Sequence, residues 1–280
     1  VARNRGTRES RGEYIQYLDS DDVLGPNKLK AHVEALRESG KDIAYGPHYW
    51  FFDSAGGRKQ LSPYANGPVP GGDYLSAGLR NWHPLVAGPF YRRSVMAEVG
   101  EWDVNLQVAQ DYDYALRAGL AGYTPVFAAD GTFFYRRHEA VRIGSSVVGQ
   151  KRFSAIDRVL SKMHDAIVQR GLLEKYRADL SCCYLQRWAH WAWDEGLVKH
   201  WFEKGVELGP PSKPIVDRRM FLFFWSLLAP LGPGVSARTI RFLIRIKRTV
   251  LGKLAGAKAG RCIGNRSEQE PGNGGRPRID

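Results

Sequence analysis

The feature that most constrains the fold is a short apolar run that ends abruptly in carboxylates. Residues 12–22 read GEYIQYLDSDD, and the β-forming residues Tyr14, Ile15 and Tyr17 predict a buried strand. In open α/β sheets, ligands bind beyond the carboxyl ends of the strands. The acidic residues that follow this strand are therefore expected at a ligand-binding edge.

Predicted helices and strands alternate up to about residue 140. Apolar residues recur at helical spacing over 28–39 and again over 111–121. Further strand-like runs occupy 43–52, 85–91 and 126–135, the last of them a strand or a hairpin. The alternation predicts an α/β fold with a mainly parallel sheet flanked by helices. Residues 150–208 are helical in pattern and predict a C-terminal helical extension, with its tryptophans in the helix-packing core.

The composition narrows the range of partners. The chain has 280 residues and 41 Lys and Arg against 29 Asp and Glu, a net charge of +12. Such a balance suggests an acidic partner, although a solvated basic surface is the alternative. Basic residues are interspersed with carboxylates until the tail, and no nucleic-acid fold signature is present, so we expect no nucleic-acid partner. Only three cysteines occur, which disfavours a disulfide framework or a zinc site and fits a cytoplasmic setting.

The C-terminal region combines apolar and basic character. Residues 220–231 are strongly apolar but fall short of the roughly 20 needed to span a bilayer. Residues 239–254 mix aliphatic side chains with Arg and Lys. This pattern predicts a basic amphipathic segment over 213–260 that lies on an anionic membrane surface, peripheral at the inner face of the cell membrane. A core helix with a basic outer face is the alternative. Residues 261–280 predict a disordered tail.

The acidic cluster itself suggests a metal site. Asp19 and Asp21 are two residues apart, so their oxygens can converge on one hard divalent ion such as Mg²⁺ or Mn²⁺. A metal there can bridge a diphosphate and stabilise it as it departs. The alternative is an acidic turn with a helix-capping Asp before Pro26.

Two stretches carry a resemblance to a known family. Residues 2–22 (ARNRGTRESRGEYIQYLDSDD) are followed by PNKL at 26–29, and VGEWDVNL at 99–106 is followed by QDYDYALR at 110–117. Together they resemble inverting glycosyltransferases of family 2, which have the GT-A (Rossmann-like) fold. The resemblance implies a nucleotide-sugar donor, with a UDP-sugar expected. It also implies that Asp19 and Asp21 bind the donor ribose and, through the metal, the diphosphate, with Asp22 as a helper.

The second stretch supplies a candidate catalytic base. In the family, the Asp of a Glu-Asp pair takes the proton from the acceptor hydroxyl, and this Asp corresponds to Asp111. Gln110 stands where the family has Glu, which removes one charge beside the base. Asp113 and Arg117 on the same predicted helix are secondary candidates. From the residues alone, the favoured interpretation of Asp111 is an acidic residue at a helix N-terminus.

Weaker matches add further candidates. The motif YRRH at 135–138 resembles a family Tyr-Arg-x-His near the donor phosphates. It implies that Arg136 and Arg137 face the diphosphate and that His138 ligates the metal, although a lone His is as often a loop residue. The resemblance also places Trp82 and His83 in the acceptor wall, where a structural Trp is an equal alternative.

These features combine into one functional expectation. We expect an inverting, metal-dependent transfer of a sugar to a hydroxyl of a glycan or lipid-linked acceptor. The alternative is a non-catalytic, membrane-associated partner in a glycan assembly complex. The resemblance predicts a catalytic domain over 1–146 that lacks the family's N-terminal part. A helical extension over 147–212, the membrane segment 213–260 and the tail 261–280 follow it.

Overall fold

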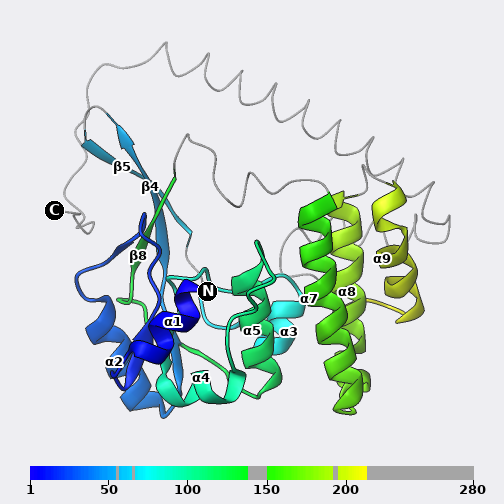
Figure 1. Cartoon of the computed structure of the whole chain (residues 1–280), viewed down its shortest axis with the longest axis horizontal. Helices are drawn as coiled ribbons and strands as arrows, with labels where there is room; N and C mark the ends of the chain where they lie inside the picture. The colour runs from blue at the N-terminus through cyan, green and yellow to red at the C-terminus, as the bar shows by residue number, and fades with distance from the viewer. Residues whose placement is uncertain (55–56, 65–66, 138–149, 192–194, 213–280) are drawn as a thin grey trace, which may run out of the picture.

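A computed structural model describes residues 1–54, 57–64, 67–137, 150–191 and 195–212. Figure 1 shows an α/β part, which holds the strands, beside a bundle formed by helices α7, α8 and α9. Helices α3 and α5 lie between the two. The N-terminal helix α1 lies on the α/β part.

The elements follow the predicted order closely. The described strands are β1 (Tyr14–Gln16), β2 (Val23–Leu24), β3 (Ile43–Tyr45), β4 (His48–Ser54), β5 (Gly57–Tyr64), β6 (Phe90–Arg92), β7 (Val126–Phe127) and β8 (Phe133–Arg136). The described helices are α1 (Ala2–Glu9), α2 (Lys28–Ser39), α3 (Tyr74–Leu79), α4 (Arg93–Val99), α5 (Gln110–Leu120), α7 (Gln150–Gln169), α8 (Leu173–Trp191) and α9 (Glu195–Glu207), with a 3-10 turn η1 (Pro70–Gly72). The α/β class expected from the alternation is therefore confirmed.

The sheets are mixed, so the expectation of mainly parallel pairing was wrong. One sheet has the order β1-β6-β3-β7 and the other β2-β8-β4-β5. The pairs β3–β7 and β4–β8 are parallel, and the other described pairs are antiparallel. The run 43–52 forms two strands, not one: β3 ends at Tyr45 and β4 begins at His48 in the other sheet, with Gly46 between them. A Cβ on Gly46 would lie 2.1 Å from the carbonyl oxygen of Gly131, so this crossing requires glycine. The chain then forms the β4–β5 hairpin instead of a crossover helix, and β6 enters antiparallel between β1 and β3.

The helices after residue 150 share one core with the α/β part. Leu79 of α3 and Leu116 of α5 belong to the same buried cluster as Val159, Trp188 and Trp201 from α7, α8 and α9. Trp188 and Trp201 are buried, as expected for a helix-packing core. The extension therefore packs directly on α5, the helix that carries the end of the second family-like stretch. The exact domain boundaries stay a prediction.

Helix α2 places a lysine inside the protein. Lys28 is fully buried, and its Nζ donates to the carbonyl oxygen of Gly88 at 2.8 Å and lies 3.1 Å from Nδ1 of His32. Burial lowers the pKa of Lys28 from its ordinary 10.5 to about 7. Lys28 thereby ties the start of α2 to the segment before β6.

Replacing Lys28 with Met should flatten the pH dependence of stability. Between pH 7 and 10.5 the Lys28 side chain is protonated in the unfolded chain and deprotonated in the folded chain. The free energy of unfolding of the wild type should therefore rise with pH across that window, by about 3–5 kcal/mol in full. Urea unfolding at several pH values measures the slope. Lys30→Met, an exposed lysine on the same helix, should keep the wild-type slope; equal slopes in all three proteins would contradict the assignment.

Two predicted segments at the C-terminus are not among the described residues. The predicted membrane segment 213–260 and the tail 261–280 lie outside the described residues, so membrane association stays a prediction that vesicle co-sedimentation would test. Within the described ranges, every helix is too short or too polar to cross a bilayer.

Candidate active site

The acidic cluster forms a tight loop between β1 and β2. The backbone N–H of Asp22 donates to the carbonyl oxygen of Asp19 at 3.1 Å, which closes the turn. Asp21 is exposed, Asp19 is half-buried and Asp22 is buried. The loop therefore presents two carboxylates outward and uses the third as part of its own framework.

Asp22 is held against the strand that carries the two candidate arginines. Its Oδ1 accepts a hydrogen bond from the backbone N–H of Arg136 at 3.0 Å. Burial raises the pKa of Asp22 to about 6; the Arg136 N–H opposes this rise, whereas Asp21 and Asp19 add to it. The guanidinium of Arg136 donates through Nε to the carbonyl oxygen of Asp21 at 2.8 Å. Arg137 is exposed, and its guanidinium lies 4.7 Å from the Trp50 ring centroid. The structure thus joins Arg136, but not Arg137, to the acidic loop by hydrogen bonds among the described residues.

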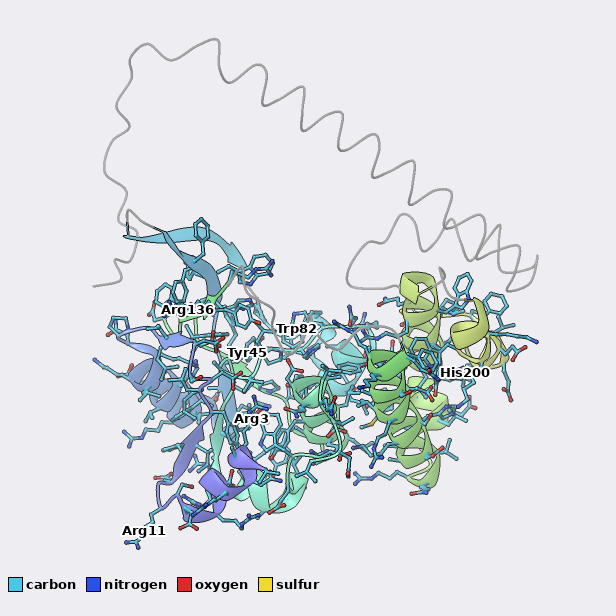
Figure 2. The ribbon with its side chains drawn as sticks, turned by 45° about the horizontal axis from the view of Figure 1, so that its top comes forward. Arg3, Arg11, Tyr45, Trp82, Arg136 and His200 are labelled. Carbon is cyan, nitrogen blue, oxygen red and sulfur yellow. The ribbon has the colours of Figure 1, made fainter. Side chains whose placement is uncertain are left out.

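Arg3 is a site residue that the sequence reasoning missed. Its guanidinium pairs with Asp19 Oδ1 at 2.8 Å and donates to Gln110 Oε1 at 2.6 Å. It also lies 5.0 Å from the Trp102 ring centroid. Figure 2 shows Arg3 inside the α/β part, away from the peripheral Arg11. The signal was its place in the family-like stretch at residues 2–22, where no role had been assigned to it.

A cavity of about 670 Å³ lies beside this arginine. Its lining comes from α1, β1, the acidic loop and the segment before α5, and includes Arg3, Asp19, Ser20, Trp102 and Gln110. Asp21, Asp22 and Asp111 are not among its lining residues. The cavity therefore follows Asp19 and Arg3 and does not span the whole set of predicted site residues.

Helix α5 places Asp111 in its first turn. One carboxylate oxygen accepts a hydrogen bond from the backbone N–H of Tyr112 at 2.9 Å, and the other lies 3.9 Å from Nε2 of His83. The side chain is 24% exposed, so solvent and a substrate hydroxyl can reach it. Ala109, which precedes the helix, has φ of 62°. A left-handed conformation is unfavourable for alanine, so the entry to α5 stores backbone strain.

The predicted acceptor residues lie near Asp111 in different ways. Burial lowers the pKa of His83; Asp111 opposes this shift and Arg187 of α8 adds to it. The His83 ring is 5.1 Å from the Tyr112 ring. Trp82 instead packs edge-on against Tyr45 and Tyr74, which favours a packing role for its ring.

Of the three predicted metal ligands, the structure describes Asp19 and Asp21. His138 lies outside the described residues. Among the residues that are described, no three His, Cys, Asp or Glu side chains converge as a metal-binding group. The carboxylates of Asp19 and Asp21 are the oxygen donors that Mg²⁺ and Mn²⁺ prefer. Crowding of three carboxylates contributes to the raised pKa of Asp22, a charge excess that a cation would relieve. The donor chemistry therefore fits a hard divalent ion.

The N-terminal part of the chain is similar to a known family. A family model described as glycosyl transferase family 2 matches residues 1–100. The match covers β1, the acidic loop and Arg3, and ends before Asp111. The chain is therefore similar to a family of enzymes over residues 1–100, where the sequence motifs predicted a resemblance.

Two relatives are similar to part of this chain. The uncharacterized glycosyltransferase YibD of Escherichia coli is 32% identical over 104 residues, which are 35% of this chain and 30% of YibD. The minor teichoic acid biosynthesis protein GgaA of Bacillus subtilis is 26% identical over 145 residues, 50% of this chain and 31% of GgaA. The chain thus spans about a third of the length of these two relatives.

The fold is similar to that of TarS from S. aureus. A structure of TarS residues 1–349 in complex with UDP-GlcNAc superposes with a TM-score of 0.59 over 88% of this chain and 71% of that fragment, at 14% identity. A second structure of the same TarS fragment gives a TM-score of 0.53 over 88% of this chain. The likeness supports the GT-A type of fold and, at this identity, the fold alone.

Proposed function

We propose that the protein transfers a sugar from a nucleoside diphosphate donor to an acceptor hydroxyl, with inversion at the anomeric carbon. The observation that carries this is the bridge made by Arg3. It joins Asp19, in the segment that matches the family 2 model, to Gln110, the neighbour of Asp111. This contact would hold the proposed donor-binding loop beside the helix that carries the proposed base.

The donor is proposed to be a UDP-sugar. TarS, which shares the fold, binds UDP-GlcNAc in its solved complex. Arg3 and Arg136 supply positive charge beside the acidic loop, and guanidinium groups suit phosphate recognition. Asp19 and Asp21 would hold Mn²⁺ or Mg²⁺, which when bound supplies neutralising charge for a departing diphosphate. The acceptor is proposed to be a glycan or lipid-linked hydroxyl, because the relative GgaA is named for teichoic acid biosynthesis.

The chemistry is a single displacement in which Asp111 acts as the base. Its carboxylate takes the proton of the acceptor hydroxyl as that oxygen bonds to the anomeric carbon. The bond between the anomeric carbon and the diphosphate oxygen breaks at the same time, and the nucleoside diphosphate leaves. Attack from the face opposite the leaving group inverts the configuration. The hydrogen bond from the Tyr112 N–H fixes one carboxylate oxygen of Asp111 and leaves the other for this role.

A donor screen tests the proposal. Nucleotide-sugars are supplied with Mn²⁺ or Mg²⁺ and a panel of glycan and lipid-linked acceptors, and released nucleoside diphosphate is measured. Acceptor-dependent release with at least one UDP-sugar is expected, with a product of inverted anomeric configuration by NMR. A retained configuration, or no release from any donor, would refute the proposal.

A further inference from the structure

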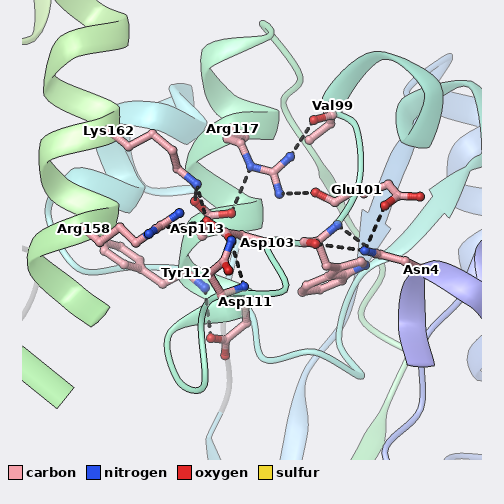
Figure 3. A network of polar contacts seen from close by, with 12 residues as sticks. Asn4, Val99, Glu101, Asp103, Asp111, Tyr112, Asp113, Arg117, Arg158 and Lys162 are labelled. Atoms are coloured by element: carbon pink, nitrogen blue, oxygen red, sulfur yellow. Dashed lines mark hydrogen bonds and ion pairs between the residues drawn. The ribbon is translucent and has the colours of Figure 1, made fainter. Parts of the chain in front are cut away.

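A network of charges connects the helical extension to the helix that bears Asp111 (Figure 3). Lys162 of α7 pairs with Asp113 Oδ1 on α5 and lies 3.4 Å from Asp103 Oδ2 in the preceding loop. Arg158, one turn earlier on α7, lies 3.5 Å from the same Asp103 oxygen. One ammonium group therefore contacts both ends of the segment 103–113, and Asp111 lies near its end.

Asp113 is a buried charge that this network compensates. Its side chain is 1% exposed, and its second oxygen accepts from Arg117 Nε at 2.9 Å. Arg117 in turn donates to the carbonyl oxygens of Val99 and Glu101. A buried carboxylate without a partner would be strongly destabilising. Because Arg117 remains when Lys162 is removed, loss of Lys162 should leave α5 folded.

Asp103 is the other end of the connection. Burial alone would raise its pKa, but the hydrogen bond from the Asn105 N–H and the charge of Lys162 outweigh that effect and lower it. Between Asp103 and Asp113 the chain passes through Ala109, whose left-handed conformation, with φ of 62°, is unfavourable for alanine. The strain lies two residues before Asp111, so the contacts at the two ends of the segment must hold that turn in place.

We propose that Lys162 is a positioning residue. By pairing with Asp103 and Asp113 it holds the strained turn at Ala109 and so fixes the carboxylate of Asp111 relative to the acceptor. This proposal rests on the proposed function. It gives helix α7 of the extension a role in positioning the base. Lys162 acts through α5 and does not touch the reacting atoms.

Kinetics of Lys162→Met in the full chain test the proposal. A misplacement of about 1 Å can cost about 100-fold in rate. We therefore expect kcat to fall about 10- to 100-fold while KM for the nucleotide-sugar stays within about twofold. Lys162→Arg should restore most of kcat. Adding Ala109→Gly to Lys162→Met should restore part of it, because glycine adopts the left-handed conformation without strain. Lys199→Met, an exposed lysine on α9, is the matched control and should keep wild-type kcat.

Hydrogen exchange gives a readout that does not depend on turnover. The backbone amides of residues 104–113 should exchange faster in Lys162→Met and return toward wild-type rates when Ala109→Gly is added. Wild-type kcat in Lys162→Met, or unchanged exchange in that segment, would overturn the proposal. A kcat loss that Ala109→Gly does not restore would overturn it as well. If the wild type turns over no donor, the proposed function fails, and the exchange experiment still tests the role of Lys162 in holding the turn.

Discussion

An Asp111→Asn variant is expected to lose about 10²- to 10⁴-fold in kcat, the usual contribution of a general base. The asparagine has the same shape, and its side-chain oxygen can still accept the Tyr112 N–H that Asp111 accepts at 2.9 Å. What disappears is the group that takes the acceptor proton. KM for the donor should change little, because the donor-side contacts of Arg3 and the acidic loop are untouched. Nucleoside diphosphate release under donor saturation measures the effect.

The control for this variant is Asp130→Asn, an exposed carboxylate in the loop before β8. It should keep wild-type kcat and unfolding temperature, and Asp111→Asn should share that unfolding temperature. Turnover by Asp111→Asn at more than about a tenth of the wild-type rate would rule out Asp111 as the base, since even weak general-base catalysis exceeds that factor. The sugar-transfer activity could still stand in that case, with another residue taking the proton.

The parts of the fold that depend on local pattern could be predicted. Helix α2 was bounded correctly at 28–39, because its apolar repeat ends at Gly40, which is left-handed with φ of 65°. The strand before the acidic loop was also placed correctly, although only Tyr14–Gln16 pairs as a strand. Sheet order could not be predicted in the same way. Nothing local in 43–52 shows that Gly46 must pass against Gly131, a contact between residues far apart in sequence.

The residues of the candidate site also divide into those that a local motif predicts and those that depend on long-range contacts. Asp19, Asp21, Asp22 and Asp111 stand out in sequence because their residue types and spacing match a motif. Arg3 gains its role only from two contacts made across the fold, with Asp19 and with Gln110. Lys162 is harder still to predict from sequence, because it lies outside the family-like stretches. Its proposed role depends on the packing of α7 on α5. Charges that act by bridging distant elements leave no periodic trace in a sequence.

An Asp21→Asn variant is expected to lose metal binding while it keeps the proposed base, Asp111. Asp21 is the exposed carboxylate of the acidic loop, and its carbonyl oxygen, which holds Arg136, is unaffected by the change. Since metal charge is worth several kcal/mol at a leaving diphosphate, kcat/KM should fall about 100- to 1,000-fold. The variant should also need far more Mn²⁺ for its residual activity, as a Mn²⁺ titration of turnover would measure. A chelator should reduce the wild type to a similarly low rate.

Direct Mn²⁺ binding, followed by electron paramagnetic resonance in the presence of the nucleoside diphosphate, distinguishes the two roles. Asp21→Asn should bind Mn²⁺ weakly, whereas Asp111→Asn should bind it as the wild type does, because Asp111 belongs to a different element. Glu38→Gln, an exposed carboxylate on α2, is the control for loss of one surface charge. Wild-type Mn²⁺ affinity in Asp21→Asn would remove Asp21 from the metal site.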